Sequence, residues 1–421
     1  MPYTDSNSDS PAPFTAARAF AYLGPFLTGL MAFSGVFARG IVNVSFAALA
    51  LWGLLALSFR QAGLLPGKWR PLPKAWVIGV SVYLGTQLLA SLAGAEPLRS
   101  LRHLGLVAYL LAVFPAVWLA AHFFPVNFAR RIPCLWGLGA IVAAFLVLRE
   151  SSYCLECVRA KANLGIIELG AILGQIPPLL LGALAIGLKE KKKLRSALLI
   201  VSLVASYVAL RINCSRIALI VAPLGCFIML AVFRDYFGKI VLGVLLILFS
   251  VGGALVITDS RVQGRLRDML NFSGSVASNQ VRIVHWRQGW DVFKENPALG
   301  VGPNAVPNAR YEDLPVNERH TPHPEFYHAH QTFLTVLAES GLIGLVGFLA
   351  LHLCPLAAAW PARRSQDPQI RFWVWAQAVV FLQLFLNGMI DHVFTLKPLM
   401  YIYWSVTAIS LWKARKEASF L

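Results

Sequence analysis

The sequence predicts an all-α integral membrane protein of about twelve transmembrane helices. Of its 421 residues, 57% are hydrophobic and only 14% are charged, whereas soluble domains carry roughly 25% charged residues. The apolar residues also gather in long stretches, and a helix needs about 20 such residues to cross the hydrocarbon of a bilayer. Hydrophobicity this high excludes a disordered chain.

Each predicted span is an apolar stretch bounded by polar or charged residues. Two stretches, 196–210 and 398–412, are short and need flanking residues to cross a membrane. The twelve stretches, in order, are 17–38, 41–59, 75–95, 104–124, 132–148, 164–188, 196–210, 217–233, 240–257, 331–358, 372–390 and 398–412.

The spans divide the chain unevenly. We predict a disordered cytoplasmic N-terminus over 1–16, spans 1–9 over 17–257, spans 10–12 over 331–412 and a cytoplasmic tail over 413–421. The connection 258–330 is far longer than the others and is predicted to face outward. Because long connections in compact proteins usually carry function, we expect it to hold part of the site.

The distribution of lysine and arginine along the chain predicts how the protein is oriented in the membrane. If the N-terminus lies inside, 20 of the 37 lysines and arginines fall on the inner side, 9 in short outer loops and 8 in the long segment. Since lysine and arginine concentrate in cytoplasmic loops, both termini are predicted to be inside. The net charge of +17 therefore does not indicate a nucleic-acid partner, although basic soluble domains often bind one.

Arginines at span ends on the predicted outer side are candidates for binding an anion. They are Arg159 before span 6, Arg216 after Ser215, Arg265 after span 9, and Arg282. Arginine is always ionised and its planar fork of donors matches phosphate geometry, so several convergent arginines suit a diphosphate. Alternatively, arginines at this level contact the headgroups of membrane lipids.

The stretch that begins at Arg282 is predicted to be amphipathic. It reads Arg-Ile-Val-His-Trp-Arg-Gln-Gly-Trp-Asp-Val-Phe. As a helix it places Arg282, Trp286, Gly289 and Phe293 on one face. A helix of this kind suits the membrane interface, where its aromatic side can enter the bilayer boundary.

Histidines are concentrated in the long segment, which holds five of the chain's nine. His330 stands at the start of span 10, where it is a candidate general base or cation, because histidine titrates near neutrality. Zinc binding by His320-x-x-His323 or His328-x-His330 is the alternative. Interposed prolines prevent a helical histidine pair, so we predict no metal site.

Two acids fall inside predicted spans. Glu168 and Glu339 are costly to place in hydrocarbon, and intramembrane acids are usually functional. Glu339 lies just before Gly341 and about two turns below the predicted boundary of span 10. We therefore expect it to hold His330 or an arginine.

Four sequence elements resemble the O-antigen ligase family. His330-Gln331, nine residues and then Gly341-Leu-Ile-Gly344 resemble the pattern His-[Asn/Ser/Gln]-x9-Gly-x-x-Gly. The others are Cys214-Ser215-Arg216 at a span end, Arg282 before Trp286, and the turn Asn296-Pro-Ala-Leu-Gly-Val-Gly-Pro303. The resemblance covers about 211–344, and their order along the chain makes it specific.

This resemblance implies a membrane glycosyltransferase of the GT-C type without metal or other cofactor. Such enzymes transfer polysaccharide from undecaprenyl diphosphate to a terminal sugar of lipid A core at the periplasmic face of the bacterial inner membrane. Arg216 and Arg282, with Arg265 and Arg159, would bind the diphosphate. His330 would deprotonate the acceptor hydroxyl and invert the anomeric carbon, or remain protonated and bind the diphosphate. Gly341 and Gly344 would let span 10 pack closely against a neighbour.

Three other functions remain open on the sequence. An O-antigen polymerase would use the same donor with a glycan acceptor. A protein O-oligosaccharyltransferase would use a protein acceptor, although such chains are usually longer. A polytopic transporter would place its functional polar residues within the spans, and the sequence lacks the paired broken helices of many transporters.

Overall fold

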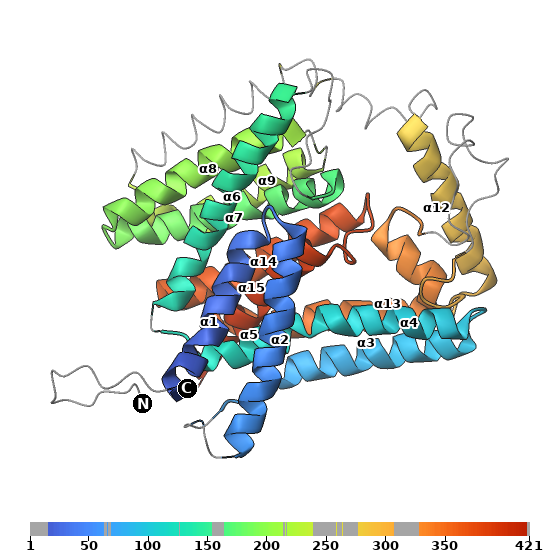
Figure 1. The fold of residues 1–421 in the computed structure, drawn as a ribbon. Coiled ribbons are helices and arrows are strands. Elements are labelled where there is room, and N and C mark those ends of the chain that lie inside the picture. The colour runs from blue at the N-terminus through green and yellow to red at the C-terminus, as the bar shows by residue number, and fades with distance from the viewer. Residues whose placement is uncertain are drawn as a thin grey trace.

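The structure is a computed structural model, and within the residues it describes every regular element is a helix. The helices pack into one bundle (Figure 1). The described residues are 16–62, 65, 69–125, 127–153, 164–213, 215, 217–238, 258, 263, 277–306 and 328–418.

The first half of the described chain forms the helices of the predicted early spans. They are α1 (Ala16–Ser34), α2 (Arg39–Gln61), α3 (Lys74–Ala93), α4 (Pro97–Leu111), α5 (Val113–Ala120), η1 (Ala121–Phe123), α6 (Phe128–Tyr153), α7 (Ile166–Lys189), α8 (Lys193–Asn213), α9 (Ala218–Val232) and η2 (Arg234–Tyr236). The later helices are α12 (Ala277–Glu295), α13 (Thr332–Ala359), η4 (Trp360–Arg364), α14 (Pro368–Gly388) and α15 (Lys397–Ala418).

Each predicted span except 240–257 falls on a helix or a run of helices; 104–124 falls on α4, α5 and η1. Eight helical segments are long and apolar enough to cross a membrane, and Ala19–Ser34 and α9 are shorter apolar helices. The all-helical prediction is confirmed for the described residues and is consistent with a polytopic membrane protein, whereas twelve spans remain a prediction. The N-terminus 1–15, span 240–257 and most of 258–330 lie outside the described residues.

Helix α7 forms the centre of one half of the bundle. It is apolar on all sides, and the whole of its spanning window is buried, as expected for a helix surrounded by other helices. Its neighbours are α6, α8, α9 and α14, of which α6, α8 and α9 lie beside it in Figure 1. Close packing uses small residues: a Cβ on Gly182 would lie 3.0 Å from the ring of Phe372.

The other half of the bundle is built on the pair α3 and α13. These two helices have the most extensive contact in the described structure, and α12 lies beside α13 at one end (Figure 1). The approach is close because Gly79 faces the backbone of α13, where an added Cβ would lie 2.8 Å from the Ala350 carbonyl oxygen. This pairing fixes α13 and therefore the residues at its N-terminus.

Helix α13 breaks at Gly341, whose backbone is left-handed (φ 62°, ψ −163°). The break frees backbone groups, which bond to the turn that follows α12. Val301 N–H donates to the Ala338 carbonyl (3.0 Å) and Gly302 N–H to that of Glu339 (2.8 Å). Leu342 N–H in turn donates to Pro297 (2.9 Å). Two motifs separated in sequence, the turn and the Gly-x-x-Gly element, thus form one backbone-bonded unit.

Gly341 allows a close approach, but of this turn and not of a neighbouring helix. A Cβ on Gly341 would lie 2.3 Å from the Ala298 carbonyl group. Gly344 adjoins Ser340 of its own helix, 2.0 Å from an added Cβ, and Gln87 of α3 at 3.5 Å. The predicted helix–helix role therefore applies to Gly344 only in part.

We expect Gly341→Ala to destabilise the protein by about 1–3 kcal/mol, because the new methyl group meets backbone atoms and the left-handed conformation is strained. Gly85→Ala in α3 is the matched control, since its Cβ would meet nothing within 4 Å. Thermal unfolding of both purified variants in detergent measures the difference. An unchanged Tm for Gly341→Ala would show that the turn does not hold the break.

Candidate active site

A charged cluster joins the N-terminus of α13, the C-terminal end of α14 and helix α12. Its centre is the carboxylate of Asp391, just beyond α14. Oδ2 accepts a hydrogen bond from Arg282 Nη2 at 3.2 Å, and Oδ1 lies 3.8 Å from His330 Nδ1. The side chains of Asp391, His330 and Arg282 are 10%, 19% and 25% exposed, so the cluster is largely shielded from solvent.

Hydrogen bonds fix the two chain segments that carry the acid and the histidine. Thr332 Oγ1 donates to the Asp391 carbonyl (3.0 Å) and accepts from Val393 N–H (3.4 Å). Gln331 caps α13 by accepting from Leu334 N–H, as N-cap residues do. The start of α13 and the segment after α14 are therefore held together by hydrogen bonds between the Thr332 side chain and backbone groups, as well as by the charged side chains.

His330 adopts a left-handed backbone conformation, with φ of 49°. A side chain in this region costs of order 1–3 kcal/mol, and such residues are found preferentially at functional sites. The capped start of α13 holds the strained residue in place. In this conformation the imidazole lies beside the Asp391 carboxylate.

Three more histidines surround His330. The rings of His285 and His328 lie 5.4 and 4.6 Å from it, and His392 stacks on His328 at 5.0 Å. The backbone N–H of His330 donates to His328 Nδ1 (3.2 Å), so that nitrogen is an acceptor. His285 is buried and comes from α12. Sequence places five of the nine histidines in the segment 258–330, but that count did not predict that His285 and His328 lie beside His330, and His392 lies beyond the segment.

Asp391 and the side chains around it shift one another's pKa values. Burial alone raises the pKa of Asp391, yet the adjacent His330 imidazole and the Arg282 guanidinium hold that pKa below its usual value. Burial lowers the pKa of His328 to about 4, and the His330 ring contributes in the same direction. The cluster thus holds an ionised carboxylate next to a neutral His328.

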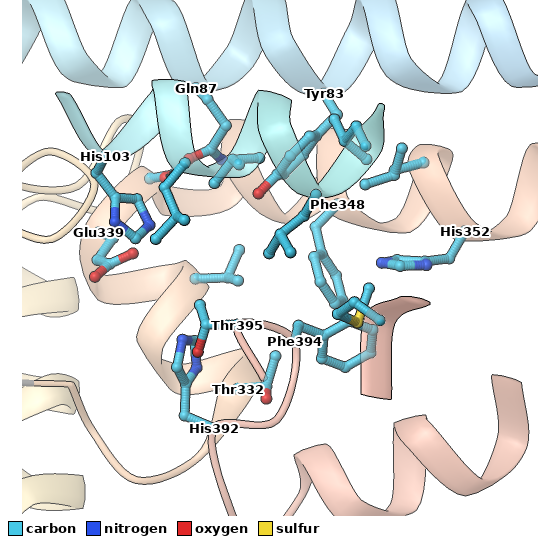
Figure 2. A pocket seen from close by; sticks show the side chains of 18 of the residues that line it. Tyr83, Gln87, His103, Thr332, Glu339, Phe348, His352, His392, Phe394 and Thr395 are labelled. Atoms are coloured by element: carbon cyan, nitrogen blue, oxygen red, sulfur yellow. Dashed lines mark hydrogen bonds between the residues drawn. The ribbon is translucent and has the colours of Figure 1, made fainter. Parts of the chain in front are cut away.

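A cavity of about 60 Å³ lies near this cluster, although Asp391, His330 and Arg282 do not line it. Thr332 and His392 form one part of its wall, and His103 and Glu339 lie next to each other at another (Figure 2). The Glu339 carboxylate accepts a hydrogen bond from the backbone of Asn304. In the described residues, the acid beside His330 and Arg282 is therefore Asp391, whereas sequence reasoning expected Glu339.

The structure describes only some of the predicted site residues. Arg282, His330 and Gln331 come together at the start of α13, and Glu339, Gly341 and Gly344 follow on the same helix. The predicted arginines Arg159, Arg216 and Arg265 lie outside the described residues. The stretch that begins at Arg282, whose face was assigned on the condition that it is helical, lies within α12.

Glu168 lies in the first turn of α7, and Ser215, in the connection between α8 and α9, packs against the same helix. Ser215 is buried against Gly170, where an added Cβ would lie 2.4 Å from the serine Cβ. Glu168 caps α7 by accepting from Gly165 N–H (3.1 Å) and from the Arg39 guanidinium (3.1 Å to Nε). The carboxylate predicted to be functional thus has structural partners.

The most important residue that sequence reasoning missed is Asp391. It stands one residue beyond the predicted span 372–390, where an acid at the end of an apolar stretch is itself a signal. Its neighbour His392 lies outside the motif that begins at His330, so no sequence pattern pointed to it. In the described ranges, no group of three or more His, Cys, Asp or Glu side chains has a metal-binding arrangement; His320 and His323 lie outside them.

Apolar helices of crossing length and a shielded charged cluster at helix ends are the features of a polytopic membrane protein with a polar site among the described residues. Residues 197–349 match the family model described as O-Antigen ligase, a family of glycosyltransferase-like ligases and polymerases. The match confirms the predicted resemblance and includes Arg282 and His330. No match is found among curated proteins.

Lowering the pH from 7 to 4.5 is expected to destabilise the protein through His328. Its folded-state pKa is about 4 and its unfolded value is about 6.5, so the unfolded state gains the proton first and stability falls as pH falls through this window. The slope is at most about 1.4 kcal/mol per pH unit for one histidine. Thermal unfolding of wild type and His328→Asn measures it; equal slopes would contradict the assignment.

Proposed function

We propose that the protein is an O-antigen ligase that transfers polysaccharide from undecaprenyl diphosphate to a terminal sugar of lipid A core. The observation that carries this proposal is the cluster of His330, Asp391 and Arg282, within and beside the region that matches the family. A base, an acid that orients it and a fixed cation are the groups that metal-free glycosyl transfer from a diphosphate needs.

In this mechanism Arg282 binds the diphosphate together with Arg216, Arg265 and Arg159. The Arg282 bond to Asp391 uses Nη2, and a guanidinium has five N–H donors, so others remain available to phosphate oxygens. The developing negative charge on the leaving diphosphate is stabilised by fixed cations. Ser215 supports the adjacent Arg216.

The acceptor hydroxyl attacks the anomeric carbon opposite the diphosphate. The new glycosidic C–O bond forms as the anomeric C–O bond to phosphate breaks, which inverts the carbon. The hydroxyl proton passes to His330, and the electron pair leaves with the diphosphate. The alternative role of His330 is that of a protonated cation on the diphosphate.

Asp391 is a positioning residue for both groups. Its two oxygens face different partners, Arg282 and His330. A carboxylate beside an imidazole fixes the ring orientation and stabilises the imidazolium that forms on proton uptake. One acid therefore sets the distance between the proposed base and the proposed phosphate-binding cation.

The proposed topology places this site at the periplasmic face of the inner membrane. With both termini in the cytoplasm, His330 begins an inward-running span and Asp391 ends an outward-running one, so both lie on the outer side. The excess of inner lysine and arginine supports this orientation. The segment 258–330 is predicted to lie on the same side, and we propose the GT-C architecture for the whole chain.

A polymerase is the second candidate, because the matched family includes both activities. A deletion strain separates the two. If the protein is the ligase, we expect full-length polysaccharide to stay on the lipid carrier and the lipid A core to remain bare. A core that carries a single repeat unit, seen by electrophoresis of extracted lipopolysaccharide, would instead identify a polymerase.

Substitution of the cluster tests the residue roles. His330→Ala is expected to lower kcat by about 10²- to 10⁴-fold, the usual contribution of a general base. Asp391→Asn should lower it by about 10- to 100-fold, as is typical when an orienting group is removed. The measurement is transfer from purified lipid-linked donor to purified core acceptor.

Two further variants give this assay its controls. Arg287→Gln removes an exposed arginine from the same helix as Arg282, and its activity should match wild type. His330→Lys keeps a cation but supplies no base at neutral pH. Substantial activity of His330→Lys would favour the diphosphate-binding role, and full activity of His330→Ala would exclude both roles.

A further inference from the structure

A second, larger cleft lies at the C-terminal end of α7, the end opposite Glu168. It has a volume of about 720 Å³ and is formed by the start of α6, the α7–α8 turn and the first turns of α8. In the proposed topology this end is cytoplasmic. Six basic residues and one acid line the cleft: Arg130, Arg131, Lys191, Lys192, Lys193, Arg195 and Glu190.

The one acid is already engaged. Glu190 Oε1 lies 3.3 Å from Arg130 Nη1, and Oε2 lies 3.7 Å from Arg195 Nη1. In the described part of the chain, no acid forms an ion pair with Arg131 or with the three consecutive lysines. Positive charge therefore converges on the cleft without compensation, which makes it a site for an anion.

Lys191 occupies a backbone position with positive φ, where glycine is normally favoured. Lys191 has φ of 55° and occupies the left-handed position of a Schellman motif at the end of α7. Lys191 N–H donates to the Leu188 carbonyl (3.0 Å) and Lys192 N–H to that of Gly187 (2.9 Å). A side chain here is unfavourable relative to glycine, so the lysine is placed at a cost to local stability.

The helix ends favour an anion as well. Arg130 and Arg131 lie in the first turn of α6, and Lys193 and Arg195 in that of α8, and neither turn contains an acid. Because helix N-termini carry partial positive charge, cations there are unfavourable and a bound anion is favourable. Membrane orientation requires basic residues on one side of the bilayer; it does not require them to converge on a cleft.

The cleft also has an apolar part. Leu194 and Leu198 of α8 line it beside the basic residues, and Leu194 is 87% exposed. An exposed leucine at the end of a candidate spanning helix faces the boundary between headgroups and acyl chains in the proposed orientation. The occupant that matches both parts has a phosphate and a hydrocarbon chain, whereas a soluble phosphate would leave the leucines uncovered.

We propose that this cleft binds an anionic phospholipid of the inner leaflet. Its phosphate contacts Arg131 and Lys191–Lys193, and its acyl chain lies along Leu194 and Leu198. Basic pockets between helices on the cytoplasmic side are suited to such headgroups. The lipid braces the turn between α7 and α8, and this role does not depend on which sugar the protein transfers.

The test uses the full chain, delipidated in neutral detergent and mixed with vesicles of phosphatidylcholine with or without cardiolipin. Because the apolar helices associate with either bilayer, the readout is thermal stability and retained lipid: wild type is expected to gain more stability from the cardiolipin vesicles and to retain cardiolipin in preference to phosphatidylcholine. Arg131→Gln/Lys191→Gln/Lys192→Gln/Lys193→Gln should bind at least about tenfold more weakly, because each basic residue at a lipid surface contributes a several-fold factor.

Two further variants show whether lipid binding depends on this cleft. One controls for the total positive charge of the protein, and the other controls for loss of folding. Lys74→Gln/Arg234→Gln/Arg364→Gln removes basic residues of the same predicted side outside the cleft, and it should bind as wild type does. Lys191→Gly removes one cation and relieves its backbone, so it should bind more weakly while unfolding at a higher temperature in phosphatidylcholine.

Three results would overturn the proposal. The first is an equal gain in thermal stability from the two kinds of vesicle, with no preferential retention of cardiolipin by wild type. The second is equal weakening by the cleft variant and the control variant, which would indicate bulk electrostatics. The third is binding of inorganic pyrophosphate to detergent-solubilised wild type, lost in the cleft variant, without any preference for cardiolipin; that result would identify a soluble ligand.

Discussion

Asp391 joins three helices, α12, α13 and α14. Its side chain bonds to Arg282 of α12 and lies beside His330 at the start of α13, while its own backbone follows α14 and accepts from Thr332. A buried carboxylate is stable only when such partners offset its lost hydration. The position of the proposed base and the position of the proposed phosphate-binding cation therefore depend on the same ionised group, and removing it would release both.

The break in α13 supplies the second constraint. A regular helix would satisfy its own backbone groups and offer nothing to a neighbouring turn. At Gly341 the freed groups of Ala338, Glu339 and Leu342 bond instead to the turn after α12. The turn thereby ties the end of α12 to the middle of α13, and Arg282, three to four turns earlier on α12, is held in the same frame as His330.

Local patterns predicted most of the helices and part of the site. Apolar length identified every span that the structure describes, and periodicity identified α12, because both properties are set by neighbours in sequence. Asp391 could not be paired with His330 from sequence, since their proximity arises only when α13 and α14 pack. The same holds for Gly341: its left-handed break requires a bonding partner near Pro297, which spacing along one helix cannot reveal.

The arrangement of charge suits the two ends of the bundle to different kinds of anion binding. In the described residues of the predicted outer side, Arg282 pairs with Asp391 and Arg39 with Glu168. The Arg282–Asp391 hydrogen bond uses one of the five guanidinium N–H donors and leaves others available, which suits a site that must bind a diphosphate and release it. At the α7–α8 turn the basic residues outnumber the single acid, which suits an anion that stays bound. The cleft, with six basic residues and one acid, supplies +5 of the net charge of +17. The rest of the basic excess is spread over other parts of the chain, and the proposed chemistry depends on a few arginines and one acid.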